Sequence, residues 1–180
     1  MTTITIPLQQ GINYISFPAT STSDFLSIFT NSTMLNNITV GGFNRFDPIS
    51  QQLQTVPYTE YIAMGMGYNI SVSTQSAIVY EGTEYALQFS DLESLLVQGW
   101  NLIGTGNNVI SLPNWCDVRV PSTNSPVTRL LPKFAYWVNY DYCQQPVINP
   151  MLAIFGAGLM ISILSLWISL RKSKTQNIDT

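Results

Sequence analysis

Apolar and polar residues alternate along much of residues 1–146, which predicts β-strands. In YNISVS, residues 68–73, apolar side chains alternate with Asn69 and two serines, so Asn69 is expected on a polar strand face. TITIPL near the N-terminus, AIVY at 77–80 and AYWVNY at 135–140 have the β-branched and aromatic composition typical of strands. Between them lie sequences that favour turns, namely VGGFN at 40–44, FDPIS at 46–50, MGMG at 64–67 and YEGTE at 80–84.

Two short segments have helical patterns instead. SDFLSIF at 23–29 places its apolar residues on one side of a helix, and SDLESLL at 90–96 begins with Ser90 and Glu93 in a capping-box arrangement. We therefore expect a mainly β fold, a small barrel or sandwich, with two short helices.

The chain also repeats itself. LQQGINYIS at 8–16 matches LVQGWNLIG at 96–104, and GMGYNISV has a looser partner in KFAYWVNY, with Tyr68 matching Tyr136. The spacing from the opening glycine to this tyrosine is 57 residues in the first copy and 37 in the second. We therefore expect a first β module at 1–88 and a second, shortened module at 89–146.

The GWNLI-type opening, the turn and the GxGYWI-type strand resemble a β repeat module of archaeal and bacterial surface proteins. Residues 11–17, 43–48 and 65–72 carry this resemblance in the first copy, and residues 99–104 and 134–138 carry it in the second. It implies a structural or adhesive unit. Trp100 and Tyr136 are large enough to fill a small core, and the alternative that such aromatics form a sugar-binding platform stays open.

Residues 151–170, MLAIFGAGLMISILSLWISL, are uncharged and mostly apolar, long enough for a helix that spans a bilayer. Arg171, Lys172 and Lys174 follow at once, so the positive-inside rule places residues 171–180 inside and the N-terminal part outside. We expect a single-pass protein with a stem and transmembrane helix at 147–170. The N-terminus has no pattern of a signal peptide.

Within this predicted helix, small residues recur four positions apart, a spacing that lets membrane helices pack closely. The pairs are Ala153 and Ala157, Gly158 and Ser162, and Ser165 and Ser169. They predict self-association or packing against other membrane proteins.

Composition narrows the chemistry. The chain has no histidine and only 9% charged residues, so a conventional catalytic triad and a histidine metal site are both unavailable. Four Lys/Arg residues lie within 1–150, too few for a nucleic-acid interface. We expect no enzyme activity, no cofactor and no nucleic-acid partner. The low charge also suggests tolerance of acid, because acid unfolding acts largely through paired carboxylates and buried histidines.

The two cysteines, Cys116 and Cys143, both fall in the second module, where a disulfide would close it. Two buried thiols are the alternative. Asn31, Asn37 and Asn69 lie in Asn-x-Ser/Thr sequences and are candidates for glycosylation.

These patterns together suggest a membrane-anchored structural surface protein with a β-rich outer part. Its architecture is similar to that of small envelope proteins of archaeal viruses, which implies assembly in a virion membrane and contact with a host receptor. The alternative is a cellular adhesin or cell-envelope protein that binds glycan through aromatic side chains such as Trp115 or Trp137.

Overall fold

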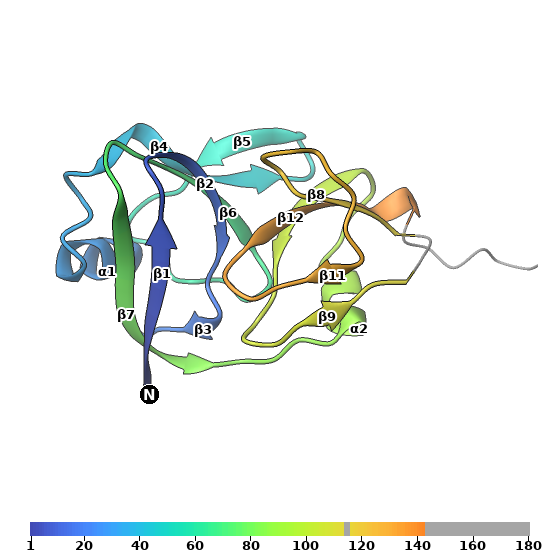
Figure 1. Cartoon of the computed structure of the whole chain (residues 1–180), viewed down its shortest axis with the longest axis horizontal. Coiled ribbons are helices and arrows are strands. Elements are labelled where there is room, and N and C mark those ends of the chain that lie inside the picture. The colour runs from blue at the N-terminus through green and yellow to red at the C-terminus, as the bar shows by residue number, and fades with distance from the viewer. Residues whose placement is uncertain (114–115, 143–180) are drawn as a thin grey trace, which may run out of the picture. The chain divides into compact units, whose positions relative to one another are not determined.

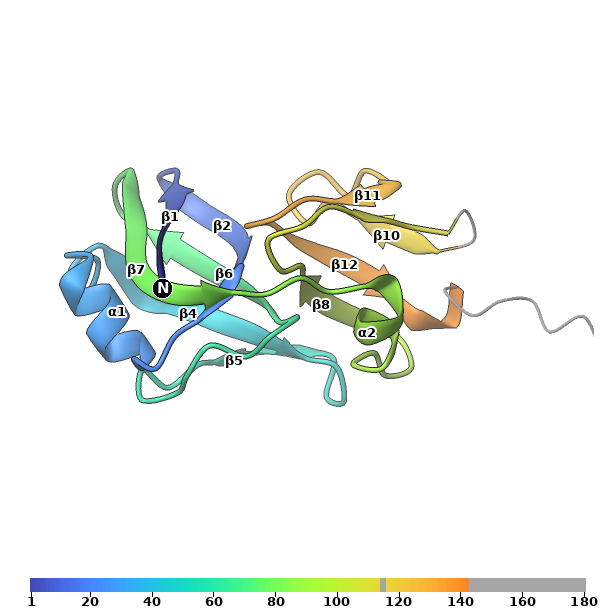
Figure 2. The same cartoon turned by 90° about the horizontal axis from the view of Figure 1, so that it is seen from below.

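The computed structural model describes residues 1–113 and 116–142, and its strands and short helices all belong to one compact unit, Met1–Gln144. The mainly β class is therefore confirmed. Within the described residues the strands form four separate sheets and no closed barrel, so the barrel alternative is wrong. Figures 1 and 2 show the two halves of this unit side by side, each built around its own sheets.

Two sheets enclose the first core. One has the order β1-β7-β3, from β1 (Thr2–Leu8), β7 (Ser76–Glu84) and β3 (Ala19–Thr20). The other has the order β2-β6-β4-β5, from β2 (Gly11–Ser16), β6 (Gly67–Val72), β4 (Ile38–Asp47) and β5 (Gln52–Thr55). The alternation in β1 buries Ile4, Ile6 and Leu8, as the period of a strand with one covered face requires.

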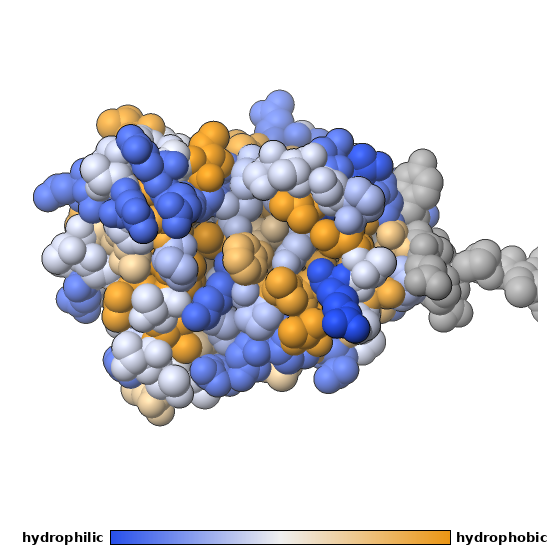
Figure 3. Space-filling view, viewed as in Figure 1, coloured by the Kyte–Doolittle hydropathy of each residue, from blue (hydrophilic) through white to orange (hydrophobic). Residues whose placement is uncertain are grey.

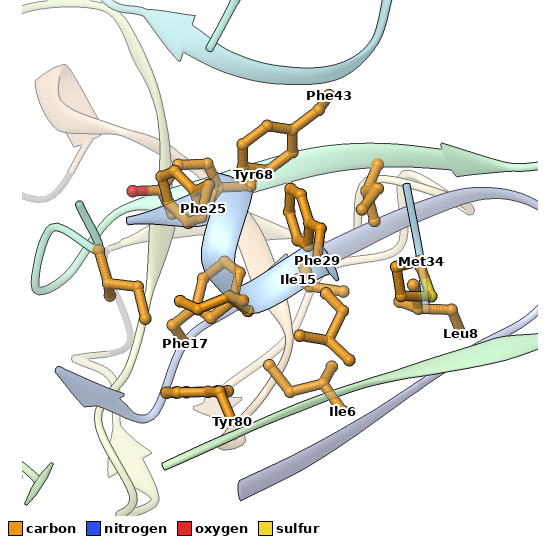
Figure 4. Close-up of a cluster of buried hydrophobic side chains, with 14 of the residues drawn as sticks. Ile6, Leu8, Ile15, Phe17, Phe25, Phe29, Met34, Phe43, Tyr68 and Tyr80 are labelled. Atoms are coloured by element: carbon orange, nitrogen blue, oxygen red, sulfur yellow. The ribbon is translucent and has the colours of Figure 1, made fainter. Parts of the chain in front are cut away.

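Aromatic side chains fill the space between these sheets (Figure 4). Phe17, Phe25 and Phe29 are fully buried, and Phe43 lies against Tyr68 with ring centroids 5.5 Å apart and an interplanar angle of 16°. Such aromatic pairs add to the stabilisation from buried area. The helix α1 (Phe25–Asn31) contributes Phe25 and Phe29 to this core, and Asp24 caps it by accepting the Ser27 backbone N–H at 2.9 Å. The expected helix at 23–29 is confirmed within two residues.

The second half is smaller. Its main sheet has the order β10-β12-β8, from β10 (Asp117–Arg119), β12 (Ala135–Asn139) and β8 (Trp100–Gly104). A second pair joins β9 (Ile110–Ser111) to β11 (Arg129–Leu130), and a 3-10 turn covers Tyr140–Tyr142. Its core is built from eight buried residues of the described chain: Leu92, Leu96, Ile103, Ile110, Val118, Leu130, Tyr136 and Val138.

The second helix begins earlier than expected. α2 spans Phe89–Glu93 and its N-cap is Gln88, whose backbone N–H is accepted by the Asp91 carboxylate at 2.7 Å. The capping box expected from Ser90 and Glu93 is therefore wrong, because the helix starts two residues earlier and Asp91 occupies the position expected for Glu93.

Two expected turns are strands instead. VGGFN lies within β4, where a bulge between Ile38 and Phe43 accommodates Gly41 at a φ of 68°. YEGTE ends β7, because Gly82 and Glu81 pair with Thr2 and Thr3 of β1. The turns at 46–50 and 64–67 are confirmed, and Asp47 accepts the Ile49 backbone N–H at 3.1 Å.

The two halves repeat the same local structure around the paired strands β2 with β6 and β8 with β12. Gly11 is the first residue of β2 and Gly99 immediately precedes β8, and their positive φ angles of 97° and 88° are conformations that favour glycine. In the first half Ile15 pairs with Tyr68, and in the second the equivalent Ile103 pairs with Tyr136.

The tyrosines also repeat a hydrogen bond. The backbone N–H of Ala63 donates to the Tyr68 hydroxyl at 3.3 Å, and that of Leu131 donates to the Tyr136 hydroxyl at 3.1 Å. Each donor lies five residues before its tyrosine. Much of the shortening of the second module falls where the first has α1, since β9 leads to β10 without a helix among the described residues.

Candidate functional site

A pocket of about 350 Å³ lies where the β4–β5 hairpin of the first module meets the main sheet of the second. Its lining residues are aromatic or carry amides: Phe46, Gln51, Trp100, Asn124 and Trp137. The sequence repeat alone does not identify this pocket, because it forms only where the two modules meet.

The sheet β10-β12-β8 positions the two tryptophans. Trp137 lies opposite Leu102 of β8 and Arg119 of β10, and Trp100 lies opposite Asn139 two pairs further along. Side chains two residues apart share a strand face, so Trp100, Leu102 and Trp137 all project to the same side of the sheet. The opposite side carries Tyr136 and Val138 into the core.

The first module supplies one wall. Phe46 meets Trp137 edge to face, with ring centroids 4.7 Å apart and an interplanar angle of 86°. Phe46, Leu102 and Ala135 form a small buried cluster against which Tyr14 and both tryptophans pack. This packing holds the pocket's aromatic side chains in place without help from a ligand.

A bidentate ion pair lies beside the pocket. Arg119 donates from Nε to Asp117 Oδ1 at 2.9 Å and from a terminal nitrogen to Oδ2 at 3.1 Å. Its guanidinium carbon also lies 5.9 Å from the centroid of the Trp100 ring, within reach of a cation–π interaction. The Asp117 carboxylate raises the pKa of Arg119 through this hydrogen bond. The positive charge of Arg119 and the negative charge of Asp117 cancel, and the pocket lining itself carries no charged residue.

The amides line the pocket from the tips of two hairpins. Gln51 Nε2 donates to the Trp100 carbonyl at 3.1 Å and also to Pro48. Asn124 is exposed, and its side chain makes no hydrogen bond to any part of the chain that the structure describes. Gln51 and Asn124 have positive φ angles of 56° and 55°, uncommon for residues other than glycine.

The aromatics singled out from the sequence thus have different roles. Tyr136 is 5% exposed and its hydroxyl is occupied by Leu131, so Tyr136 belongs to the core and not to a sugar-binding platform. Trp100 and Trp137 are half-buried and line the pocket. Trp115 lies outside the described residues.

The other predicted site residues are dispersed. Cys116 packs partly buried against the second core, and Cys143 lies outside the described residues, so their disulfide stays a prediction. The helix-packing residues Ala153, Ala157, Gly158, Ser162, Ser165 and Ser169 also lie outside the described residues. Among the residues described, no helix is long and apolar enough to span a bilayer.

The three glycosylation candidates differ in exposure. Asn31 is exposed at the end of α1, and Asn37 is half-buried. Asn69 is 6% exposed and lies in β6, an inner strand of the β2-β6-β4-β5 sheet, so the strand face that was expected to be polar is covered at Asn69. The reason is tertiary: both faces of β6 are covered, whereas the alternating pattern predicts one polar face.

A second hollow, beside β2, is more apolar. Its lining includes Ile12, Tyr14, Pro121, Leu131 and Phe134, of which Phe134 is 56% exposed. Figure 3 shows apolar surface gathered over β11 and β12 on this face of the molecule.

None of the residues that line the pocket near the tryptophans carries a carboxylate, thiol or amine. Within residues 1–113 and 116–142, no cluster of three or more potential metal ligands occurs. Comparison with protein-family models, curated proteins and solved structures gives no match to this chain.

Proposed function

We propose that this chain is a single-pass, membrane-anchored surface protein that presents its β unit outside the membrane as a structural contact module. The observation that carries the proposal is the uncharged run at 151–170 followed immediately by Arg171, Lys172 and Lys174. The boundary between compact units, at Gln144 and Gln145, lies just before this run, which is consistent with a stem there.

The setting we propose is the envelope of an archaeal virus, with assembly through the membrane helix and host contact through the β unit. The very low charge and the resemblance to surface-protein modules support this setting. Positions 153, 157, 158, 162, 165 and 169 are the proposed contacts between helices.

The proposal is tested by alkaline carbonate extraction of membranes from cells that express the full chain. The wild-type protein should stay in the membrane pellet. Ile161→Arg combined with Leu164→Arg should release it, because each arginine near the helix centre costs about 2.5–3.5 kcal/mol of insertion free energy. Ile49→Arg is the matched control, since Ile49 is 86% exposed in the β unit and the change adds the same type of charge.

Retention of the doubly substituted chain would contradict a membrane helix at 151–170. Orientation is tested separately by protease treatment of intact cells or particles. The β unit should be digested or shed from the outside while an epitope at the C-terminus stays protected. Protection of the β unit would reverse the proposed topology.

A further inference from the structure

We propose that the pocket lined by Trp100, Trp137 and Phe46 binds a neutral pyranose ring. This inference goes beyond membrane anchoring and does not depend on it, because the pocket lies wholly within residues 46–137. Its volume, about 350 Å³, is within the range of sites for small ligands, which combine apolar walls with a few polar groups.

The aromatic walls suit the apolar face of a sugar. An aromatic ring carries partial negative charge on its face, which attracts C–H groups polarised by neighbouring oxygen atoms. Trp100 and Trp137 are both half-buried, so each is fixed on one side and exposes part of its ring system. Phe46 packs edge to face against Trp137, and the Arg119 guanidinium lies over the Trp100 ring. These contacts limit the motion of the two tryptophan side chains.

The polar groups suit sugar hydroxyls. An amide side chain offers both donors and an acceptor, and a hydroxyl group can satisfy either. The Asn124 side chain neither donates nor accepts a hydrogen bond within the described residues, so its amide can do both with a ligand. The Gln51 Nε2 group donates to the Trp100 carbonyl, but Gln51 Oε1 accepts no hydrogen bond from the described residues. No lining residue is charged, so the pocket favours a neutral ligand over an anionic one.

The backbone at the rim supports a binding role. Four described residues other than glycine have positive φ angles, and two of them, Gln51 and Asn124, line this one pocket. Such conformations cost free energy and cluster at ligand sites, where the surrounding structure holds them.

The internal repeat provides a natural comparison. The position equivalent to Trp100 is Ile12, and the position equivalent to Trp137 is Asn69, so the first module lacks the aromatic pair. Ile12 is 64% exposed. The first module has no equivalent pair of tryptophans, so a second sugar site is not expected there, and Ile12 is the matched control position for Trp100.

The test uses the full chain in a zwitterionic detergent. A detergent with a sugar headgroup is avoided because that headgroup would compete with the probes for the pocket. The probes are the methyl glycosides of mannose, glucose and galactose together with N-acetylglucosamine, measured by saturation-transfer NMR and tryptophan fluorescence. At least one should bind with a Kd on the order of 1 mM. Trp100→Ala should weaken that binding roughly tenfold or more through lost apolar contact.

A second variant addresses the possibility that Trp100→Ala disturbs folding. Asn124→Gly removes the amide while glycine accepts the φ of 55°, and it should weaken binding by about threefold or more. Ile12→Ala should leave the affinity unchanged. Three results would overturn the proposal: no probe binds, Ile12→Ala weakens binding as much as Trp100→Ala, or an oligoproline peptide binds the pocket where the sugars do not.

Discussion

Ser16 and Gly104 occupy equivalent positions in the two repeats and touch each other. A Cβ atom on Gly104 would overlap the Ser16 Cβ. Each of the two residues also donates its backbone N–H to the other module. The Ser16 N–H donates to the Lys133 carbonyl at 3.1 Å and the Gly104 N–H donates to the Gly65 carbonyl at 2.9 Å, and Lys133 and Gly65 are again equivalent positions of the repeat. The two modules are thus joined through corresponding residues, with an approximate local two-fold relation.

This contact predicts that Gly104→Ser destabilises the β unit by about 1–3 kcal/mol, because overpacking forces neighbouring atoms apart. Chemical denaturation measures the loss. The exchanged double variant Ser16→Gly/Gly104→Ser should recover part of it, since the overlap with the Ser16 side chain is removed while the Met66 carbonyl oxygen stays 2.9 Å from a Cβ at position 104. Additive losses in the double variant would argue against direct packing of the two positions.

The equivalent residues Asn13 and Asn101 make matching hydrogen bonds in the two modules, and their replacement should lower stability. Asn101 Oδ1 accepts the Val97 N–H at 3.1 Å, and its amide donates to the Val97 and Gly99 carbonyls at 2.8 and 3.0 Å. Asn13 makes the equivalent three bonds with Gln9 and Gly11 at 2.9, 2.8 and 3.0 Å.

Substitution by alanine should therefore destabilise both turns, and Asn101→Ala should cost more than Asn13→Ala. Asn101 is 3% exposed whereas Asn13 is half-buried, so the loss of the Asn101 hydrogen bonds should cost more, about 1–3 kcal/mol. Thermal and urea unfolding measure both changes, with the exposed Asn36→Ala as the control. A larger effect at Asn13 would contradict the role of burial.

Buried tyrosines predict a loss of stability at alkaline pH. Burial raises the pKa of Tyr68 to about 12 and also raises the pKa values of Tyr80, Tyr85 and Tyr136. The unfolded chain releases these protons near pH 10, so stability is complete below about pH 10 and falls as pH rises toward 12.

Denaturant unfolding at fixed pH values, with absorbance at 295 nm to follow phenolate formation, measures this loss. Tyr68→Phe should make the decline with pH shallower, although it also removes the acceptor for the Ala63 N–H. Stability that stays constant from pH 9 to pH 12 would show that these hydroxyls are not held neutral by the fold.

The predicted disulfide gives a thermodynamic test. Cys116→Ser and Cys143→Ser should each lower the stability of the β unit by about 3 kcal/mol, the value for a closed loop of roughly 28 residues. The double variant should lose no more than either single variant, and reduction of the wild-type protein should produce the same loss. Additive losses would indicate two separately buried thiols.

The predicted helix contacts give a test of assembly. Gly158→Ile should dissociate oligomers of the full chain in mild detergent, because the larger side chain keeps helix backbones apart. Met160→Ile is the control, since residue 160 faces away from residue 158 on an ideal helix. Light scattering of both variants, beside a chain that ends at Gln145, measures the state. An unchanged oligomer in Gly158→Ile would place the contact elsewhere.

The sequence by itself determined the β class, the strand at residues 2–8, the Asp47–Pro48 turn and the two glycine openings. These features depend on contacts within a few residues: the alternation of side chains, the φ freedom of Gly11 and Gly99, and the hydrogen bond that the Asp47 carboxylate accepts from the Ile49 N–H. Features that depend only on neighbouring residues can be predicted from a single sequence.

Only the tertiary structure decided that Asn69 is buried, that Tyr136 belongs to the core, and that Phe46 closes a pocket over Trp137. Each result depends on what packs against a strand face, within a module for Tyr136 and across the module junction for Phe46 and Trp137. Periodicity specifies the two faces of a strand but not what covers them, because that is set by packing between residues far apart in the chain.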